Sequence, residues 1–346
     1  MARILYGVMG NTHGHTMRTS AIIEQMPQHE FQFVGGGRVP AAFQDRYPVH
    51  EVPVLRTVHK KQRVDVPAVI GQIMQRLTET PSIARDLLRL IDRFQPDLIV
   101  ADREFFLPIA CQMGRLPCVS IDHSHVMKAC RYPVPHDQLI SWSLAMVNDY
   151  LLFDFTRDNL VVSFFHPPLA PGRTDQLLRP VLRREVRGVT SRPGETIFVY
   201  QTSATFWPLL ETLRQSQRRV VIYGMRSEAG TDGNLEFRAF DRQRILEDLA
   251  ESAYVVVNGG HNLICEALHF GKPVLCFPIR TLFEQWINAW HVRDLGFGDF
   301  SLSLNPGIEL FEEFEKNLAS YTERLRNQNF DGTMAAVAAL ESRLPA

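Results

Sequence analysis

The stretch Tyr254-Val-Val-Val-Asn258-Gly259-Gly260-His261-Asn262 leads from an apolar strand directly into two glycines and the start of a helix. Glycines at such a turn let a ligand approach the backbone closely. The first amides of a helix and the positive end of its dipole attract anions without the help of a lysine. The stretch therefore predicts a βα unit whose turn can hold a phosphate group.

The residues that follow complete this unit. Asn262 and Glu266 are four residues apart, so they lie on one face of the predicted helix. A carboxylate one turn beyond a bound diphosphate can accept hydrogen bonds from two ribose hydroxyls. Gly271-Lys272-Pro273 ends the helix and begins the next strand. The alternative is a plain βαβ turn with a glutamate on the surface.

Short apolar runs of the same kind recur along the chain and alternate with segments of helical periodicity. Continuous apolar runs are typical of strands buried on both faces of a parallel sheet. The pattern predicts an α/β protein with open, doubly wound sheets. The expected strands are Arg3–Val8, Phe31–Gly35, Leu98–Ala101, Cys118–Ile121, Leu160–Ser163, Thr196–Tyr200, Arg219–Tyr223, Leu235–Ala239, Tyr254–Asn258 and Val274–Phe277.

A proline-rich segment, His166-Pro-Pro-Leu-Ala-Pro-Gly-Arg-Thr174, separates two halves with this rhythm. Three prolines and a glycine cannot continue a helix or an inner strand. We therefore expect two Rossmann-like domains that face a cleft, over residues 1–168 and 169–325. Residues 326–346 are expected to form a C-terminal helix that can pack back on the first domain.

Composition limits the class of protein. The 346 residues contain 37 Lys and Arg against 38 Asp and Glu, a net charge of −1, which argues against a nucleic-acid partner. The five cysteines form no C-x-x-C pair, so a reducing compartment fits best. Apolar runs stay shorter than the ~20 residues that cross a bilayer. Because the first apolar run is too short for a signal peptide, we expect a cytoplasmic protein.

The first strand leads into a second glycine-rich loop, Gly7-Val-Met-Gly10-Asn-Thr-His-Gly14-His15-Thr-Met-Arg18. Ligands bind at the carboxyl ends of strands in open α/β sheets. The spacing of the glycines is not G-x-G-x-x-G, and the chain has no G-x-x-x-x-G-K-[ST] loop. An ordinary dinucleotide site or P-loop is therefore disfavoured.

Paired histidines allow three interpretations of this loop. His13 and His15 could bind a metal together with the second pair, His123 and His125. They could instead carry a proton or orient a sugar hydroxyl, or they could merely satisfy a polar loop. The metal interpretation ranks low, because it requires the glycine motif of the second half to be accidental.

A third motif, Phe283-Glu284-Gln285-Trp286-Ile-Asn288-Ala289, begins a helix after a loop at the same sheet edge as the first motif. Glu284 and Gln285 could receive the hydroxyls of a sugar attached to a diphosphate. Alternatively, Glu284 simply places a negative charge in the first helical turn.

With these three motifs, the chain resembles the glycosyltransferases of the GT-B fold. The resemblance is to the group that contains the N-acetylglucosaminyltransferase of peptidoglycan lipid-intermediate synthesis and the macrolide and plant UDP-sugar transferases. It covers nearly the full length in topology. In motifs it rests on Gly7–Arg18, Asn258–Pro273 and Phe283–Ala289.

The resemblance implies a role for each motif residue. The second domain would bind the donor nucleotide, a UDP-sugar above all, and the first domain the acceptor. His15 would be the general base, and the loop Gly10–His15 would lie under the diphosphate and the acceptor. The donor or its nucleotide would contact Gly10, Gly14, Arg18, Thr202, Ser203, Phe240, Gly259, Gly260, His261, Asn262, Glu266, Glu284 and Gln285.

Sugar transfer of this kind is direct displacement at the anomeric carbon with inversion. A base takes the proton of the acceptor hydroxyl, and the helix start stabilises the departing diphosphate. The chain contains no D-x-D, so we expect neither a required metal nor a cofactor. Asp102, at the end of a predicted strand, is the alternative base, or it orients a histidine or caps a helix. Gln201-Thr202-Ser203-Ala204 departs from the family's glycine-serine turn, which leaves the donor open.

Other functions stay open at this point. A non-hydrolysing UDP-sugar epimerase uses the same architecture, although its set of acidic residues is not identifiable here. A metal-dependent hydrolase or a bilobal binding protein ranks lower. Aromatic residues make a lipid-linked acceptor conceivable, and with it peripheral contact with the inner face of the membrane. Residues 140–155 form either a core helix, which we expect, or a helix at a membrane surface.

Overall fold

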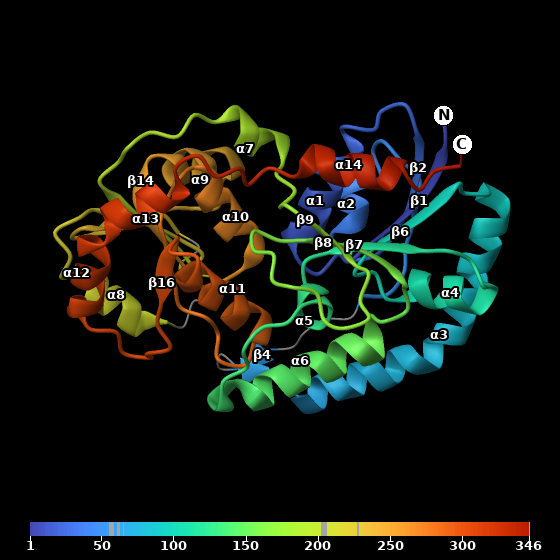
Figure 1. The fold of residues 1–346 in the computed structure, drawn as a ribbon, viewed down its shortest axis with the longest axis horizontal. Helices are drawn as coiled ribbons and strands as arrows, with labels where there is room; N and C mark the ends of the chain where they lie inside the picture. The colour runs from blue at the N-terminus through green and yellow to red at the C-terminus, as the bar shows by residue number, and fades with distance from the viewer. Residues whose placement is uncertain (55–58, 61–62, 65, 202–205, 227, 346) are drawn as a thin grey trace. The chain divides into compact units, whose positions relative to one another are not determined.

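The computed structural model describes residues 1–54, 59–60, 63–64, 66–201, 206–226 and 228–345. The chain forms two compact α/β units (Figure 1). Unit 1 comprises residues 1–60, 64–183 and 331–346, and unit 2 comprises residues 61–63 and 184–330. Residues 169–183 thus belong to unit 1, whereas the sequence placed the boundary at 168.

Unit 1 is built on a seven-stranded sheet in the order β3-β2-β1-β6-β7-β8-β9, with every neighbouring pair parallel. Because β1 and β6 are neighbours in register, Val8 lies beside Asp102 where both strands end. The strands are β1 (Arg3–Val8), β2 (Glu30–Val34), β3 (Val49–His50), β6 (Leu98–Asp102), β7 (Val119–Asp122), β8 (Asp158–Val162) and β9 (Gln176–Leu178).

Helices cover both faces of this sheet. Apolar residues of α1, α2 and α14 pack on one face, and those of α3, α4 and the end of α6 pack on the other. The helices are α1 (His13–Ile23), α2 (Val39–Phe43), α3 (Val66–Phe94), α4 (Phe106–Gly114), α5 (Val126–Ala129), α6 (Leu139–Leu152) and α14 (Thr333–Glu341). A short 3₁₀ turn (His136–Gln138) precedes α6, and β4 (His59–Lys60) pairs with β5 (Arg63–Val64).

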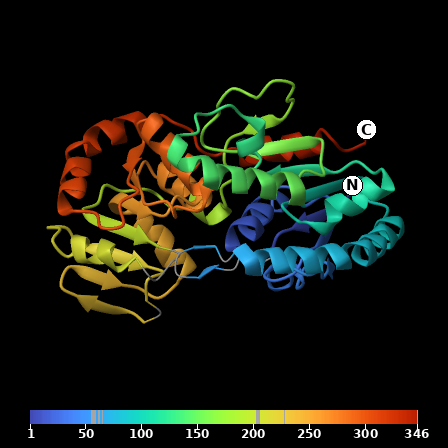
Figure 2. The same ribbon diagram turned by 90° about the horizontal axis from the view of Figure 1, so that it is seen from below.

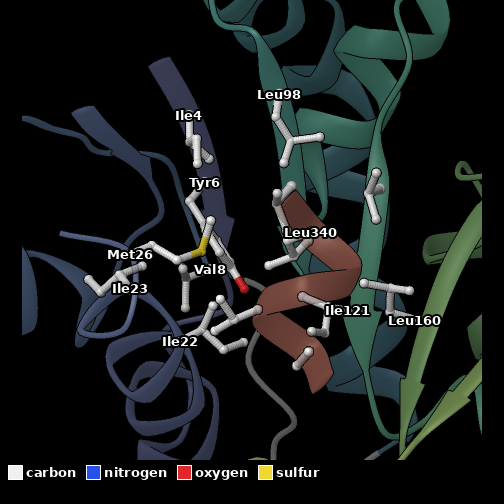
Figure 3. Packing of buried hydrophobic residues seen from close by; sticks show 14 of the residues in the cluster. Ile4, Tyr6, Val8, Ile22, Ile23, Met26, Leu98, Ile121, Leu160 and Leu340 are labelled. Carbon is white, nitrogen blue, oxygen red and sulfur yellow. The ribbon is translucent and has the colours of Figure 1, made fainter. Parts of the chain in front are cut away.

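The last helix of the chain, α14, belongs to the core of unit 1. Figure 3 shows Leu340 of α14 beside Tyr6 and Ile22, with Leu98 and Ile121 in the same cluster. All five side chains are buried. The C-terminal segment therefore completes the apolar layer between α1 and the sheet.

Unit 2 contains the second seven-stranded sheet, in the order β12-β13-β11-β10-β14-β15-β16. All its pairs are parallel except β12 with β13. The strands are β10 (Thr196–Tyr200), β11 (Val220–Tyr223), β12 (Gly230–Asp232), β13 (Leu235–Phe237), β14 (Ser252–Val257), β15 (Val274–Cys276) and β16 (Gly298–Phe300). Its core joins β10, β11 and β14 to α8 and α12.

The helices of unit 2 follow the expected alternation with strands. They are α7 (Arg184–Gly188), α8 (Trp207–Leu213), α9 (Arg242–Ala250), α10 (His261–His269), α11 (Phe283–Asp294), α12 (Ile308–Lys316) and α13 (Leu318–Leu325). Each of the ten expected strands coincides with an observed one, with ends that differ by up to two residues. The short outer strands β3, β9, β12 and β16 were missed, because two or three residues carry no readable periodicity.

Helix α6 contradicts the expectation of a core helix over residues 140–155. Its buried residues are Ser141, Asp149 and Leu152, while most of its large apolar side chains face solvent. Two of these three buried residues are polar, and one of them, Asp149, pairs with Arg103. Within the described ranges, no helix has both the length and the apolarity needed to cross a bilayer.

Candidate active site

The carboxyl ends of β1 and β6 bring together residues that are far apart in the sequence. The loop after β1 leads into α1, whose first turns carry His15 and Arg18. Strand β6 ends at Asp102, which is fully buried next to the end of β1. Because the two central strands β1 and β6 are parallel neighbours, Asp102 lies next to the start of α1 at residue 13.

These three side chains form one hydrogen-bonded group. His15 Nδ1 lies 2.7 Å from Asp102 Oδ1. Arg18 donates from Nε to Asp102 Oδ2 over 2.8 Å and from Nη2 to Asp102 Oδ1, so it holds the carboxylate with both nitrogens. Arg18 Nη2 also lies 3.0 Å from His15 Nδ1. Because Nδ1 is engaged by the group, Nε2 is the His15 nitrogen left for a substrate.

Burial sets the electrostatics of this group. Arg18 and Asp102 are buried, whereas the His15 side chain is 18% exposed. Burial by itself would lower the pKa of the Arg18 guanidinium, but the charge of Asp102 and the hydrogen bonds to it raise that pKa instead. Burial, followed by the charge of Asp102, raises the pKa of Tyr6 behind them. Asp102 and Arg18 thus form a fixed ion pair with an accessible imidazole at its edge.

Gly10 and Gly14, in and after the loop between β1 and α1, have different surroundings. A Cβ on Gly10 would lie 1.8 Å from the carbonyl oxygen of Gly36, so the close approach of two chain segments requires glycine there. Gly14 lies in the first turn of α1. The sequence assigned both residues to the donor, and the packing of Gly10 gives that residue a structural reason of its own.

A small pocket lies at this same edge of the sheet, with an empty space of about 250 Å³ when the open solvent at its mouth is included. Most of its lining is apolar, and its charged members are Arg103 and Glu104. Burial raises the pKa of Glu104 to about 7, although the backbone amides of Leu107 and Phe106, at the start of α4, oppose the rise. The lining residues are Val8, Met9, Gly10, Gly36, Val52, Pro53, Val54, Arg103, Glu104 and Phe105.

The second histidine pair lies at the end of β7. His125 Nδ1 bonds the Asp122 carboxylate, and Asp122 Oδ1 accepts from the His125 amide over 2.9 Å. Burial alone would raise the pKa of Asp122, but the charge and hydrogen bonds of His125, with Arg103, hold it well below its usual range. His123 Nδ1 lies 3.0 Å from the Val162 carbonyl oxygen. Across the described ranges, no three His, Cys, Asp or Glu side chains converge as metal ligands would.

In unit 2, the turn between β14 and α10 has the geometry that its two glycines predict. Gly259 adopts φ +101°, and a Cβ there would lie 2.7 Å from the carbonyl oxygen of Gln285. A Cβ on Gly260 would meet no atom within 4 Å. Among the residues that the structure describes, no side chain caps the start of α10. Gly260 therefore sits at an uncapped helix start with open space beside it.

Two asparagines that the sequence analysis left without a role hold this turn in place. Asn288 Nδ2, on α11, donates to the Gly259 carbonyl over 3.0 Å. Asn258 Nδ2 donates to Gln201 Oε1 over 2.5 Å and to the Phe277 carbonyl over 3.3 Å. Asn258 directly follows β14, and Asn288 is in the second turn of α11. These positions, near the carboxyl ends of the strands of unit 2, are the signal that could have identified the two residues.

The other predicted donor residues lie around this turn or nearby in unit 2. His261, Asn262 and Glu266 are on α10, and Glu266 is buried one turn beyond Asn262. Gln285 Oε1 accepts from the Ile279 amide over 3.0 Å, and Glu284 is in the first turn of α11. Phe240 is 56% exposed between β13 and α9. Thr202 and Ser203 lie outside the described residues.

Comparisons with known proteins agree with this architecture. A model of glycosyl transferase family 1 matches residues 2–318. The chain is similar to an uncharacterized glycosyltransferase of Methanosarcina mazei, with 25% identity over 382 residues that cover 99% of each chain.

Two solved structures are similar to this chain over almost its whole length. The glycotransferase of kitacinnamycin gives a TM-score of 0.71 at 19% identity, with 99% of each chain covered. A UDP-glucosyltransferase from Polygonum tinctorium gives 0.67 at 13% identity, with 100% of this chain and 99% of that one covered. The expected fold class and the expected glycosyltransferase activity are confirmed. With two parallel-sheet α/β units of the GT-B fold, the chain belongs to glycosyl transferase family 1.

Proposed function

We propose that the protein is an inverting glycosyltransferase that moves a sugar from a nucleoside diphosphate sugar, a UDP-sugar first of all, to an acceptor hydroxyl. The observation that carries the proposal is the group His15–Asp102–Arg18, in which a buried ion pair fixes an imidazole whose edge is exposed. A histidine held through Nδ1 by a carboxylate is suited to act as a general base through Nε2.

In the proposed reaction His15 Nε2 takes the proton of the acceptor hydroxyl. The acceptor oxygen attacks the anomeric carbon, and the bond between that carbon and the diphosphate oxygen breaks. The electron pair of this bond leaves with the nucleoside diphosphate. Because attack and departure take place on opposite sides of the carbon, the configuration inverts. Asp102 stabilises the imidazolium that forms.

Arg18 takes a different role in this proposal from the donor contact that the sequence indicated. Its side chain is buried and holds both oxygens of Asp102. A guanidinium matches a carboxylate in geometry, so it fixes the orientation of Asp102 and offsets part of its charge. We therefore assign Arg18 as a positioning residue for the His15–Asp102 pair.

The donor site of the proposal is the turn at Gly259 and Gly260 in unit 2. The uncapped start of α10 supplies amides and a helix dipole for the diphosphate, including the charge that grows on it as it leaves. Glu266, one turn further along α10, would bind the ribose hydroxyls. Glu284 and Gln285 would face the sugar, and Phe240, with its exposed ring, would meet the base. Thr202 and Ser203 stay assigned to the phosphates.

The acceptor of the proposal is an apolar molecule that bears a hydroxyl. The support is the largely apolar cavity beside Gly10, at the same sheet edge as the end of β6. A lipid-linked acceptor is compatible with this lining.

A ligand screen tests the donor half of the proposal. UDP, TDP, GDP, ADP and their sugars are compared by the rise in melting temperature that each causes. UDP should give the largest rise, Glu266→Ala should abolish it, and Glu312→Ala, on the exposed side of α12, should retain it. A full rise in the Glu266→Ala variant would contradict the ribose assignment.

The stereochemistry of the product tests the catalytic half. NMR of the anomeric proton should give the opposite configuration from the donor sugar, and His15→Ala should remove product without removing nucleotide binding. A product with retained configuration would contradict direct displacement.

A further inference from the structure

Helix α6 of unit 1 turns its polar side chains inward. Asp149 is buried and accepts a hydrogen bond from Arg103 Nη2 over 2.9 Å. Ser141 is also buried and donates to the Gln138 carbonyl over 3.0 Å. Surface helices of globular proteins have the opposite arrangement, with apolar residues toward the core. The inward ion pair fixes this unusual orientation of α6.

The outward side of α6 is consequently apolar. Six of the fourteen large apolar side chains that are exposed in the described part of the chain lie on this one helix. Ile140 is 79% exposed and Leu151 is 66% exposed. The six are Leu139, Ile140, Leu144, Val147, Tyr150 and Leu151. Figure 1 shows α6 along the lower edge of unit 1, and Figure 2 shows it from below.

The width and the lack of charge of the exposed face of α6 favour a lipid phase over a protein partner. At 100° per residue, the exposed positions from Leu139 to Leu151 span an arc of about 140°, wider than the narrow seam that one partner helix covers. Ser143 is the polar residue within the arc, and none of the exposed α6 positions carries a charge. A broad, uncharged face fits a fluid apolar phase better than a second protein surface.

The length and flanks of α6 indicate how it would meet such a phase. Its 14 residues span about 21 Å, less than the ~30 Å of a bilayer core, so the helix would lie along the surface. Exposed Arg131 precedes the helix and exposed Arg157 follows it. Of the acidic groups near its ends, Asp154 pairs with Lys128, whereas exposed Asp137 accepts from the neutral amide of Gln138 and keeps its charge. The two arginines are exposed, so they can meet phosphate groups.

We propose that α6 docks unit 1 on the surface of a lipid bilayer that contains anionic headgroups. The apolar face enters the boundary between headgroups and acyl chains, and Arg131 and Arg157 contact lipid phosphates. This proposal is independent of the proposed reaction, because none of these residues belongs to the group around His15 or to the turn at Gly260.

Co-sedimentation with vesicles tests the proposal on the full chain. Wild-type protein should bind vesicles of phosphatidylcholine with phosphatidylglycerol. Leu144→Glu should weaken the partition constant at least about tenfold, since it puts a charge into the apolar face. The matched control is Met334→Glu, on α14 of the same unit, because Leu144 and Met334 are 52% and 58% exposed. It should change binding less than about twofold.

The flanking arginines give a second, smaller effect. Arg131→Gln and Arg157→Gln should each weaken binding to the anionic vesicles about fivefold and have little effect on vesicles of phosphatidylcholine alone. Far-ultraviolet circular dichroism and the melting temperature of every variant show whether the fold is kept, which is expected because all the positions are exposed.

Three results would overturn the proposal. The first is wild-type protein that stays in the supernatant with anionic vesicles, and the second is a Leu144→Glu variant that binds as the wild type does. The third is a dimer in analytical ultracentrifugation that Leu144→Glu dissociates, without any vesicle binding, because α6 would then cover a second copy of the chain.

Discussion

Unit 1 holds two aspartate–histidine pairs at the carboxyl ends of neighbouring strands, and they differ in access. His15 and Asp102 come from α1 and β6, and the His15 side chain keeps 18% of its surface exposed. His125 and Asp122 are three residues apart in one turn after β7, and both are buried. Each imidazole faces its carboxylate through Nδ1. Residue types alone therefore do not distinguish the proposed base from the second histidine, whereas the exposure of the imidazole does.

The strand register separates the two pairs. Ala101 of β6 pairs with Ser120 of β7, so Asp102 lies level with Ile121, and Asp122 is one residue further along. Successive side chains on a strand point to opposite faces. Asp102 therefore points to the face covered by α1, where Ile121 packs, and Asp122 points to the face covered by α3 and α4.

The sharpest test exchanges each histidine for alanine. His15→Ala should lower kcat/KM about 1,000-fold, or about 4 kcal/mol of transition-state stabilisation, because the proposed general base is lost. His125→Ala should change kcat/KM less than about threefold. Steady-state kinetics with a fixed UDP-sugar measures both. Equal losses of kcat/KM in the two variants would show that the exposure of the imidazole does not distinguish the two histidines.

The buried pair should instead carry stability. Asp122→Asn should cost about 2–4 kcal/mol of unfolding free energy in urea at pH 7, since it leaves buried groups without their charged partner. Because the pKa of Asp122 is held below its usual range, its contribution is present above about pH 4 and is lost as the pH falls further. The gap between wild type and variant should shrink below that pH, and a constant gap would contradict the ion-pair account.

Arg18→Lys tests the role of Arg18 as a positioning residue for the His15–Asp102 pair. A lysine keeps the charge but cannot hold both carboxylate oxygens, so kcat/KM should fall about tenfold. Less of the Asp102 charge would then be offset beside His15, which favours the protonated imidazole. The acidic limb of the pH–rate profile should move to higher pH, and an unmoved limb with the same tenfold loss would indicate a purely structural role.

Ser120→Ala should have the smallest effect. Its hydroxyl donates to Asp122 over 3.2 Å, so its removal should cost about 1 kcal/mol of unfolding free energy. The value of kcat/KM should be unchanged, because Ser120 contacts the buried His125–Asp122 pair. A loss of activity larger than about threefold would show that the two pairs are coupled.

Apolar periodicity predicted the two sheets well, because strands buried on both faces leave continuous apolar runs. The glycine turn at Gly259 and Gly260 was also predictable, since a left-handed residue and an uncapped helix start both leave signals in the sequence. The same reasoning named His15 as the base and gave Asp102 as an alternative base or as a residue that orients a histidine. It could not pair them with Arg18, because that group depends on the register of β1 beside β6.

Helix α6 was misassigned for a related reason. Composition reports how apolar a segment is, but the side that faces the core depends on a partner. Here Asp149 pairs with Arg103, the residue after Asp102, and this contact between residues 46 positions apart turns the polar side inward. The periodicity of α6 alone carries no trace of that contact.

The place of α14 in unit 1 has a consequence for synthesis on the ribosome. Unit 2 emerges as the continuous segment 184–330, while unit 1 must wait for residues 331–346 before Leu340 can cover Ile22. The nascent first half therefore keeps an apolar surface open until residues 331–346 have emerged. Emergence of α14, rather than emergence of the first half, marks the moment at which unit 1 can close.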